Sequence, residues 1–415
     1  MNALAWRRDP IEARLAAVGL PPLPRTAWLE IDLEALRANL GSLRQLAGAN
    51  VTVRPVVKAD AYGHGAVPVA AALESAGADG FCVAAFDEAM ELREGGIRGP
   101  LLVLYPIPAS LATDAAHAGV SVTAGDPELL AELVAAMAGF GGDPLAVELE
   151  VETGLGRGGL SGERLIDAAR MIEAGPGLRL EGLWTHLQAV EDADLTSLQL
   201  HRYEATATAL ADAGVTVPPR HVAASAAMLA GGIGMYDGIR PGLAIYGLVP
   251  DELADAKVPI DASVTLRPVM ALYARAVRVE DLPDGWGISY GPTFRTTRPS
   301  RIATLPLGYG DGWSRSLSNR AEALVRGFRV PLVGNVAMDA VMADVTDVPG
   351  PPVGVADEFV LLGESGPDRI TAADLAHERT TNSWELVTGM ARRLPRVYHA
   401  AAGPVGLRAL TERRT

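Results

Sequence analysis

The repeated alternation of short apolar segments with Ala-rich, helix-like segments limits this chain to a small number of folds. Each apolar segment has the length of a buried strand, and the segment after it has helical periodicity. A repeated strand–helix order predicts an α/β fold with a parallel sheet. The predicted strands are Val51–Val57, Phe81–Ala85, Leu101–Tyr105, Val120–Thr123, Leu145–Val151, Leu178–Thr185, His221–Ala224 and Gly238–Arg240. The predicted helices include Asp87–Glu94, Pro127–Met137, Glu163–Glu173 and Leu195–Ala213.

Two parallel-sheet folds share this order, the closed (β/α)8 barrel and the open doubly wound sheet. About eight strands within about 240 residues match the usual size of a barrel. Polar residues that could take part in catalysis or binding also lie at or just after the C-terminal ends of five predicted strands. Barrel enzymes build their active sites on that face. These residues are Lys58, Arg157, His186, Ser225 and Arg240. We therefore predict a (β/α)8 TIM-type barrel.

The alternation stops after Val264, and a second, mostly β domain is predicted there. Its expected strands are Val269–Asp281, Arg301–Leu307, Ala323–Val348 and Glu358–Leu362, and its one expected helix is Ala372–Glu378.

The segment before the barrel has one expected short helix, Ile11–Val18, followed by a stiff P-P-L-P linker. An amphipathic helix is expected over Asp32–Ala47. The predicted organisation is an N-terminal extension (1–27), a barrel domain (28–264) and a C-terminal β domain (265–415).

Composition excludes several classes of protein. The net charge of −14 and the pI near 5.0 argue against binding to nucleic acid. No apolar run approaches the length of a membrane span, and residues 1–24 do not resemble a signal peptide. The single cysteine, Cys82, cannot form an internal disulfide, which fits a reducing cytoplasm. The seven histidines lack metal-ligand spacing, so no metal site is expected.

The segment V-V-K-A-D-A-Y-G-H-G, Val56–Gly65, is the first candidate for chemistry. A lysine at a strand end is usually a surface residue, but Lys58 is flanked by apolar residues. Desolvation lowers the pKa of an amine, as a Schiff-base lysine requires. The hydroxyl of Tyr62 can bind an anion such as phosphate. These residues are suggestive of a pyridoxal phosphate site.

A glycine-rich segment, G-L-G-R-G-G over Gly154–Gly159, supports a rival class, the nicotinamide-dependent oxidoreductases. The dinucleotide fingerprint also requires an acidic residue at the end of the next strand. The candidates are Glu173, within a predicted helix, and Glu181, at the start of a strand. The fingerprint normally opens its domain, whereas this segment follows the fifth predicted strand, so the dinucleotide interpretation is disfavoured.

The order K-A-D-A-Y-G-H-G resembles that of the alanine racemases, fold-type III pyridoxal-phosphate enzymes, and further similarity extends from about Trp28 to Tyr398. The resemblance implies that Lys58 carries the cofactor as a Schiff base and that Tyr62 holds its phosphate. It implies that Ser225, Gly242 and Leu243 contribute to the phosphate site. Ser225 alone also fits a helix N-cap.

Three further roles are implied by the same resemblance. The segment E-T-G-L-G-R-G-G implies that Arg157 contacts the phenolic oxygen of the cofactor and the substrate carboxylate. W-T-H-L implies that His186 stacks near the cofactor and hydrogen-bonds a catalytic tyrosine, although a histidine there is often only a core polar group. I-R-P-G-L implies that Arg240 faces the pyridine nitrogen, and an arginine cannot give up its proton to that ring.

The resemblance continues in the second domain. G-I-S-Y-G-P-T implies that Tyr290 is a second catalytic base that reaches across a homodimer interface. L-G-Y-G-D-G implies that Tyr309 gates the entrance, and N-V-A-M-D implies that the backbone of Met338 meets the substrate.

Several positions depart from the pattern of the family. Glu150 stands where many members have a carbamylated lysine that positions the arginine matching Arg157. The other departures are Glu152, Ala224, Ala337 and Arg392. These departures bear on the identity of the substrate more than on the identity of the cofactor.

The implied function is a cytoplasmic, homodimeric pyridoxal-phosphate racemase that interconverts L- and D-alanine through Lys58 and Tyr290. The alternatives are a racemase or epimerase for serine or another amino acid, a fold-III enzyme of altered reaction such as a decarboxylase, and a non-catalytic pyridoxal-phosphate carrier. The S-Y-G tyrosine disfavours the decarboxylase, and the β domain disfavours the carrier.

Overall fold

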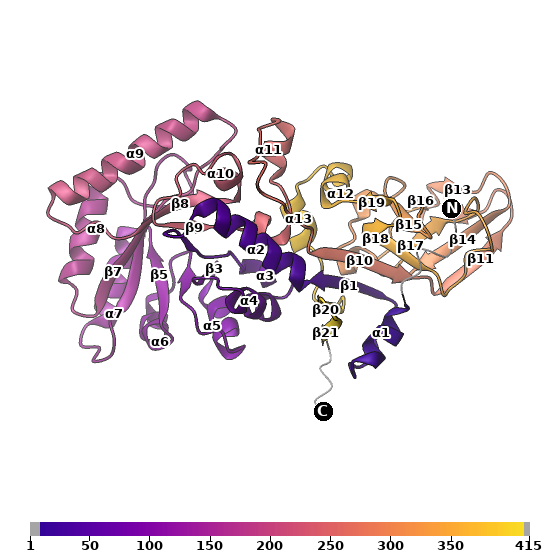
Figure 1. The fold of residues 1–415 in the computed structure, drawn as a ribbon, viewed down its shortest axis with the longest axis horizontal. Helices are drawn as coiled ribbons and strands as arrows, with labels where there is room; N and C mark the ends of the chain where they lie inside the picture. Colours follow the sequence, from indigo (N-terminus) through magenta and orange to yellow (C-terminus); the bar gives the residue numbers. More distant parts are fainter. Residues whose placement is uncertain (1–8, 411–415) are drawn as a thin grey trace. The chain divides into compact units, whose positions relative to one another are not determined.

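The computed structural model describes residues 9–410, which divide into two compact units (Figure 1). The barrel unit consists of Leu36–Ala61 and Gly65–Arg267. The β unit consists of the chain up to Ala35, the short segment Tyr62–His64, and the chain from Pro268 onward. Residues 1–8 of the predicted extension and 411–415 of the predicted β domain lie outside the described residues. The predicted domain boundaries at 27/28 and 264/265 stay a prediction.

The barrel unit contains eight parallel strands in the order β2-β9-β8-β7-β6-β5-β4-β3. They are β2 (Thr52–Val53), β3 (Phe81–Val83), β4 (Leu101–Val103), β5 (Val120–Ala124), β6 (Leu145–Glu150), β7 (Leu178–Trp184), β8 (Arg220–Ala224) and β9 (Gly238–Arg240). A parallel bridge between Val56 and Cys82 joins the two ends of this order. The Cys82 N–H donates to the Pro55 carbonyl at 3.0 Å, and the Val57 N–H donates to the Cys82 carbonyl at 2.9 Å. The predicted barrel is therefore confirmed, and the open sheet is excluded.

The first barrel strand is shorter than the sequence predicts. Val51–Val57 is expected as one strand, but β2 ends at Val53. On the side of β3, bridge pairing resumes only at Val56, whereas on the other side the N–H groups of Arg54 and Val56 still donate to the Ile239 and Pro241 carbonyls at 3.0 and 2.9 Å. Pro55 has no N–H to donate, so the ladder is interrupted where a continuous strand was expected. Cys82 is fully buried in β3, and burial raises the pKa of its thiol to about 11.

One helix precedes the first barrel strand and the others come after barrel strands, and several lie along the outer side of the sheet (Figure 1). They are α2 (Leu33–Ala47), α4 (Ala66–Ser75), α5 (Phe86–Glu94), α6 (Ala112–His117), α7 (Pro127–Met137), α8 (Glu163–Ala174), α9 (Ala193–Asp212), α10 (Ser225–Leu229) and α11 (Asp251–Asp255), with short 3-10 turns at Ala109–Leu111 and Leu243–Tyr246. The bounds of α7 match the prediction, because Asp126 caps its first N–H groups and Pro127 occupies the first turn.

The β unit is built on an eleven-stranded sheet in the order β11-β14-β17-β16-β15-β18-β10-β1-β20-β21, with β19 paired to β18. Its strands are β1 (Ala27–Asp32), β10 (Met270–Arg275), β11 (Arg278–Leu282), β14 (Ser300–Leu305), β15 (Glu322–Val325), β16 (Phe328–Val333), β17 (Val341–Asp344), β18 (Glu358–Ser365), β19 (Asp368–Ile370), β20 (Arg396–Ala400) and β21 (Gly403–Arg408). A separate hairpin pairs β12 (Gly287–Ile288) with β13 (Phe294–Arg295). The prediction of a second, mostly β domain is confirmed.

Three local predictions for the β unit were wrong. Val269–Asp281 is expected as one strand, but it forms β10 and β11, which lie in different parts of the sheet. The segment expected over Ala323–Val348 forms three strands, β15, β16 and β17. Besides α12 (Ala372–Arg379), the unit contains a second helix, α13 (Ser383–Thr388). The side chain of Asn382 accepts a hydrogen bond from the Glu385 N–H and caps α13, which is a local signal that a helix starts there.

The expected N-terminal helix is present as α1 (Ile11–Ala17). Its two fully buried residues, Ile11 and Leu15, form a core cluster with Trp28 of β1 and Val397 of β20. The segment before the linker is therefore part of the core of the β unit rather than an appendage to it.

Leu15→Ala should consequently lower the free energy of unfolding by about 2–5 kcal/mol, because it leaves a cavity in a packed cluster. Val18→Ala is the matched control, since Val18 is 48% exposed at the end of the same helix. Urea-induced unfolding of both variants measures the difference. Equal stabilities would mean that α1 does not contribute to the core.

Candidate active site

The structure brings five predicted site residues to one rim of the barrel. Lys58 follows the Val56–Cys82 bridge, and Arg157 lies in the loop after β6. His186 comes two residues after β7, Ser225 comes directly after β8, and Arg240 is the last residue of β9. Because all these strands are parallel, their C-terminal ends meet at the same rim.

Lys58 has the electrostatic surroundings of a reactive amine. Its pKa is lowered from the ordinary lysine value, mainly by burial and then by the positive charge of Arg157. The carboxylate of Glu88 opposes this shift in part. A lysine with a lowered pKa holds more of its neutral form near neutral pH, and the neutral form is the nucleophile and base.

The backbone after Lys58 is a left-handed turn made of non-glycine residues. Ala59, Asp60, Ala61 and Tyr62 have φ values of 52°, 56°, 54° and 51°. This conformation costs an L-residue roughly 1–2 kcal/mol. The sequence prediction for this segment was only a loop before a helix, and no residue in it signals a left-handed turn.

Hydrogen bonds from the surrounding barrel unit hold this strained turn. The Ala59 N–H donates to Glu88 Oε1 at 2.6 Å, and Glu88 Oε2 accepts from the Ala84 N–H at 2.7 Å. On the other side, Asp60 Oδ1 accepts from the N–H of Ala66 at 2.9 Å. Glu88 and Asp60 therefore compensate the strain that fixes the direction of Lys58.

Arg240 is 3% exposed and hydrogen-bonded mainly through its terminal nitrogens. Nη1 donates to Nδ1 and to the carbonyl of His221 at 2.5 and 2.8 Å, and Nη2 donates to the Thr185 carbonyl at 2.7 Å. The guanidinium also lies 4.9 Å from the ring centre of Trp184. Within residues 9–410, its Nε–H makes no hydrogen bond, so this buried cation retains one donor for a ligand.

Ser225 gathers backbone N–H groups at the same rim. Its hydroxyl oxygen accepts from the N–H of Gly242 at 3.0 Å and of Ala244 at 3.1 Å. Since the oxygen accepts twice, the hydroxyl proton is left to donate outward. The prediction that Ser225 is an N-cap was wrong, because Ala224 occupies that position and Ser225 begins α10. The predicted residue Leu243 begins the 3-10 turn beside this cluster.

Arg157 forms an ion pair with Glu150, the unusual residue of this site. Arg157 Nη2 lies 3.7 Å from Glu150 Oε1, and Glu150 is 6% exposed, so it does not point to solvent. The other neighbour of the guanidinium is the ring of Tyr105, at 5.7 Å from its centre. A Cβ atom on Gly158 would lie 3.1 Å from Glu150 Oε2. The glycine-rich loop thus makes room for a carboxylate, a different use from cradling a pyrophosphate.

His186 is held neutral at this rim. Burial, and then the charges of Arg240, Arg157 and Lys58, lower its pKa to about 3. It can therefore exchange hydrogen bonds at physiological pH without adding a further positive charge to the site.

Sequence reasoning missed a buried chain of polar side chains behind Arg240. Glu148 of β6 contacts Arg54 at 2.8 Å and His221 at 2.6 Å, and His221 contacts Arg240. One signal was available, since Glu148 and Glu150 alternate in an otherwise apolar strand and so lie on the same side of it.

The β unit holds the remaining predicted residues on loops that are tied together. The Asn335 side chain donates to the Tyr290 carbonyl at 2.7 Å. The N–H of Tyr309 donates to the Ala337 carbonyl at 3.0 Å, and the Gly310 N–H donates to the Met338 carbonyl at 2.9 Å. The side chains of Tyr290, Tyr309 and Met338 are 80%, 44% and 53% exposed. Tyr62, 8% exposed, lies in the short segment Tyr62–His64 of the same unit.

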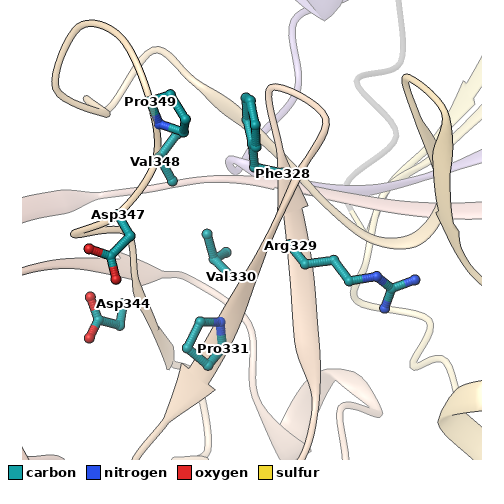
Figure 2. Close-up of a pocket in the computed structure, with 8 residues that line it drawn as sticks. All are labelled: Phe328, Arg329, Val330, Pro331, Asp344, Asp347, Val348 and Pro349. Carbon is teal, nitrogen blue, oxygen red and sulfur yellow. The ribbon is translucent and has the colours of Figure 1, made fainter.

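A pocket of about 250 Å³ in the β unit contains none of the predicted site residues (Figure 2). It is lined by Phe328, Arg329, Val330, Pro331, Asp344, Asp347, Val348 and Pro349. Its charged side chains already have protein partners: Asp344 accepts from Thr346, Asp347 pairs with Arg298, and Arg329 pairs with Asp368 and Glu322. This pocket is therefore a weaker candidate than the barrel rim.

Comparison with known proteins agrees with this arrangement. Residues 31–250 match the family model of the alanine racemase N-terminal domain, and residues 269–398 match that of the alanine racemase C-terminal domain. An alanine racemase of Halothermothrix orenii is 36% identical over 383 residues, which cover 92% of this chain and 99% of the relative.

Solved structures show the same similarity. The alanine racemase of Bacillus anthracis with bound L-Ala-P has a TM-score of 0.86 at 32% identity, covering 93% of this chain and 98% of that one. A histidine racemase from Leuconostoc mesenteroides has a TM-score of 0.83 at 28% identity, covering 91% and 99%. Since both domain models match and together span most of its length, the chain belongs to the alanine racemase family.

Proposed function

We propose that this protein is a pyridoxal-phosphate-dependent racemase that interconverts L- and D-alanine. The observation that carries the proposal is that Lys58, whose pKa is lowered, and the buried Arg240, whose Nε–H is open, lie at the same rim of the barrel. The relatives from Halothermothrix orenii and Bacillus anthracis are alanine racemases by name, and the histidine racemase supports a second candidate, a larger amino-acid substrate. Incubation with single L-amino acids, followed by chiral analysis of the products, distinguishes the two.

The donors at the rim fit pyridoxal phosphate. Lys58 would hold the aldehyde carbon of the cofactor covalently through its amine. The Ser225 hydroxyl, with the backbone of Gly242 and Leu243, would bind the phosphate, and Tyr62 is proposed to contribute its hydroxyl. The Nε–H of Arg240 makes no hydrogen bond within residues 9–410 and can donate to an acceptor, and an unprotonated ring nitrogen supplies one.

The residues of the chain have separate roles in binding the substrate and in proton transfer. When bound, the cofactor supplies an electron sink that makes the Cα–H of an attached amino acid acidic. Lys58 Nζ removes or returns the proton on one face of Cα, for which its lowered pKa suits it. Arg157, held by Glu150, binds the substrate carboxylate. Arg240 only donates and stays protonated, so no proton passes through it.

The second base is proposed to come from another copy of the chain. Tyr290 is 80% exposed, and Trp286, Tyr309 and Met338 are also large exposed side chains of the β unit. Exposed large apolar groups of this kind mark protein–protein interaction surfaces. A homodimer in which Tyr290 serves the opposite face of Cα, and Tyr309 and Met338 border the substrate, would account for this exposure.

Two further assignments are part of the proposal. No helix among residues 9–410 is both long enough and apolar enough to cross a membrane. We propose a cytoplasmic location on the ground that the lone cysteine forms no internal disulfide. We also propose that the functional domains follow the boundaries 1–27, 28–264 and 265–415.

Replacement of Lys58 tests the cofactor link directly. Lys58 and Lys257 are the two lysines of the sequence, which makes Lys257→Ala the matched control. Lys58→Ala should abolish both the absorbance of lysine-bound cofactor and racemisation, whereas Lys257→Ala should retain both. Borohydride reduction and peptide mapping should locate the cofactor on Lys58 in the wild type. A reducible adduct at wild-type level in Lys58→Ala would refute the assignment.

A complementation experiment tests the shared site. Lys58→Ala and Tyr290→Phe homodimers should each be nearly inactive, because each site lacks one base. Mixed dimers should recover activity, because one of their two sites then contains both Lys58 and Tyr290. Activity is measured after subunit exchange, with mixed dimers verified by native mass spectrometry. Verified mixed dimers without activity would exclude a site made from two copies.

Glu150 generates the third prediction. Its carboxylate holds Arg157 without carbamylation, so wild-type kinetics should not respond to bicarbonate. Glu150→Gln removes the negative charge that orients Arg157 and should lower kcat/KM by about tenfold or more, as loss of an orienting group typically costs about 10- to 100-fold. Cofactor absorbance should be unchanged. Glu150→Lys should recover in part with added bicarbonate. Full activity of Glu150→Gln would show that the carboxylate is not needed.

A further inference from the structure

The hydrogen-bond donors and acceptors in the row of side chains behind Arg240 determine which nitrogen of His221 carries the proton. Arg240 can only donate, so Nδ1 of His221, 2.5 Å from Arg240 Nη1, must be an acceptor. The proton of the neutral imidazole is therefore on Nε2, which lies 2.6 Å from Glu148 Oε2. Burial also lowers the pKa of His221, in agreement with a neutral ring.

Glu148 is the acceptor that this arrangement requires. Its two oxygens face two donors, Arg54 Nη1 at 2.8 Å and His221 Nε2 at 2.6 Å. Burial by itself would raise the pKa of this carboxyl group, but the contacts with His221 and Arg54 outweigh it and bring the pKa to about 2. Glu148 is thus a carboxylate at every physiological pH.

The barrel makes space for this carboxylate. Gly182 of β7 is the direct register partner of Glu148, and a Cβ atom on Gly182 would lie 2.6 Å from Glu148 Cδ. Glu148 itself is fully buried. A charged side chain in the core, with a glycine opposite it and a hydrogen-bond donor for each of its two oxygens, is a constructed site rather than a stray polar group.

The far end of this chain is open to solvent. A cavity of about 820 Å³ lies where β2, β8 and β9 begin, and Arg54, His221 and Arg220 are among its lining residues. The Arg54 side chain is 22% exposed. The row Arg54–Glu148–His221–Arg240 therefore runs from this cavity to the C-terminal end of β9.

We propose that Glu148 and Arg54 are positioning residues for Arg240, acting through the tautomer of His221. Glu148 fixes the proton on Nε2, Nδ1 then accepts from Arg240 Nη1, and the guanidinium is held with its Nε–H free. Arg54 keeps Glu148 ionised. The inference rests on the proposed function only for its kinetic consequence, because the tautomer of His221 can be measured in the protein itself.

Glu148→Gln tests the proposal, because an amide can accept from only one of its two neighbours. Its NH2 group must face either Arg54 or His221, so one donor opposes another unless His221 moves its proton to Nδ1. In protein labelled with 15N-histidine, the imidazole signals of His221, assigned by their loss in His221→Asn, should report Nε2–H in the wild type. They should shift toward Nδ1–H in Glu148→Gln.

The change in the His221 tautomer in Glu148→Gln should also lower the rate of racemisation. Loss of an outer residue that orients a site group typically costs about 10- to 100-fold, and this loss should appear in kcat with little change in KM. Glu181→Gln is the matched control, since Glu181 lies in the neighbouring strand β7 and contacts Ser121 and Arg179 instead. It should leave both the tautomer and kcat unchanged.

Arg54→Ala provides an independent test should Glu148→Gln not fold. Its kcat should fall by about tenfold or more, as for other orienting groups. Added methylguanidinium should restore part of it, because the cavity admits a small cation to the position of Arg54. Arg220→Ala, a variant in the same cavity, should show no such rescue.

Five outcomes decide the proposal. It is supported by a tautomer change in Glu148→Gln together with a lower kcat, or by rescue of Arg54→Ala. It is overturned by an unchanged tautomer, by an unchanged kcat despite a changed tautomer, or by a loss in Arg54→Ala that methylguanidinium does not restore. A tautomer change in a protein that racemises no amino acid would refute the proposed function and the kinetic role, while the hydrogen-bond row would stand.

Discussion

Closure of the barrel on both sides of β2 is the constraint on which the rest of the site depends. The Val56–Cys82 bridge places the strand end that carries Lys58 next to β3, and the pairing of β2 with β9 places it next to Arg240. Residues separated by more than a hundred positions in sequence thereby share one rim. In an open sheet, the first and last strands would lie at opposite edges, and these two cations would not act on the same small molecule.

Charge balance inside the barrel follows from this closure. Among the four cations of the barrel site, Arg240 is buried, Arg54 and Lys58 are half-buried and Arg157 is exposed, and the buried carboxylates are Glu148 and Glu150. Glu148 serves Arg54 and, through His221, Arg240, while Glu150 serves Arg157. Lys58 lies near a carboxylate, that of Glu88, but its pKa is nevertheless lowered, since burial and Arg157 dominate. The pairing thus leaves the amine as the one cation of the rim that gives up its proton easily.

The strand–helix alternation predicted the barrel, its eight strands and the grouping of Lys58, Arg157, His186, Ser225 and Arg240, because strand periodicity and parallel connection determine which residues share a rim. Three features of the structure could not be predicted from this alternation. The A-D-A-Y turn has no glycine where φ is positive, so no residue preference announces it. β10 and β11 are continuous in the sequence pattern because only two residues, both apolar, separate them. The Glu148–His221 contact joins strands 73 positions apart, and only their spatial neighbourhood reveals it.

The left-handed turn after Lys58 has a consequence for which part of the chain sets the direction of the amine. Part of the compensation for its strain is local, from Asp60, but the other part comes from Glu88, at a sequence separation of 29 positions from Ala59. Contacts of such separation form only after the loop between them has closed. The direction of the amine is therefore not a property of its own segment, because it depends on α5, the helix that carries Glu88.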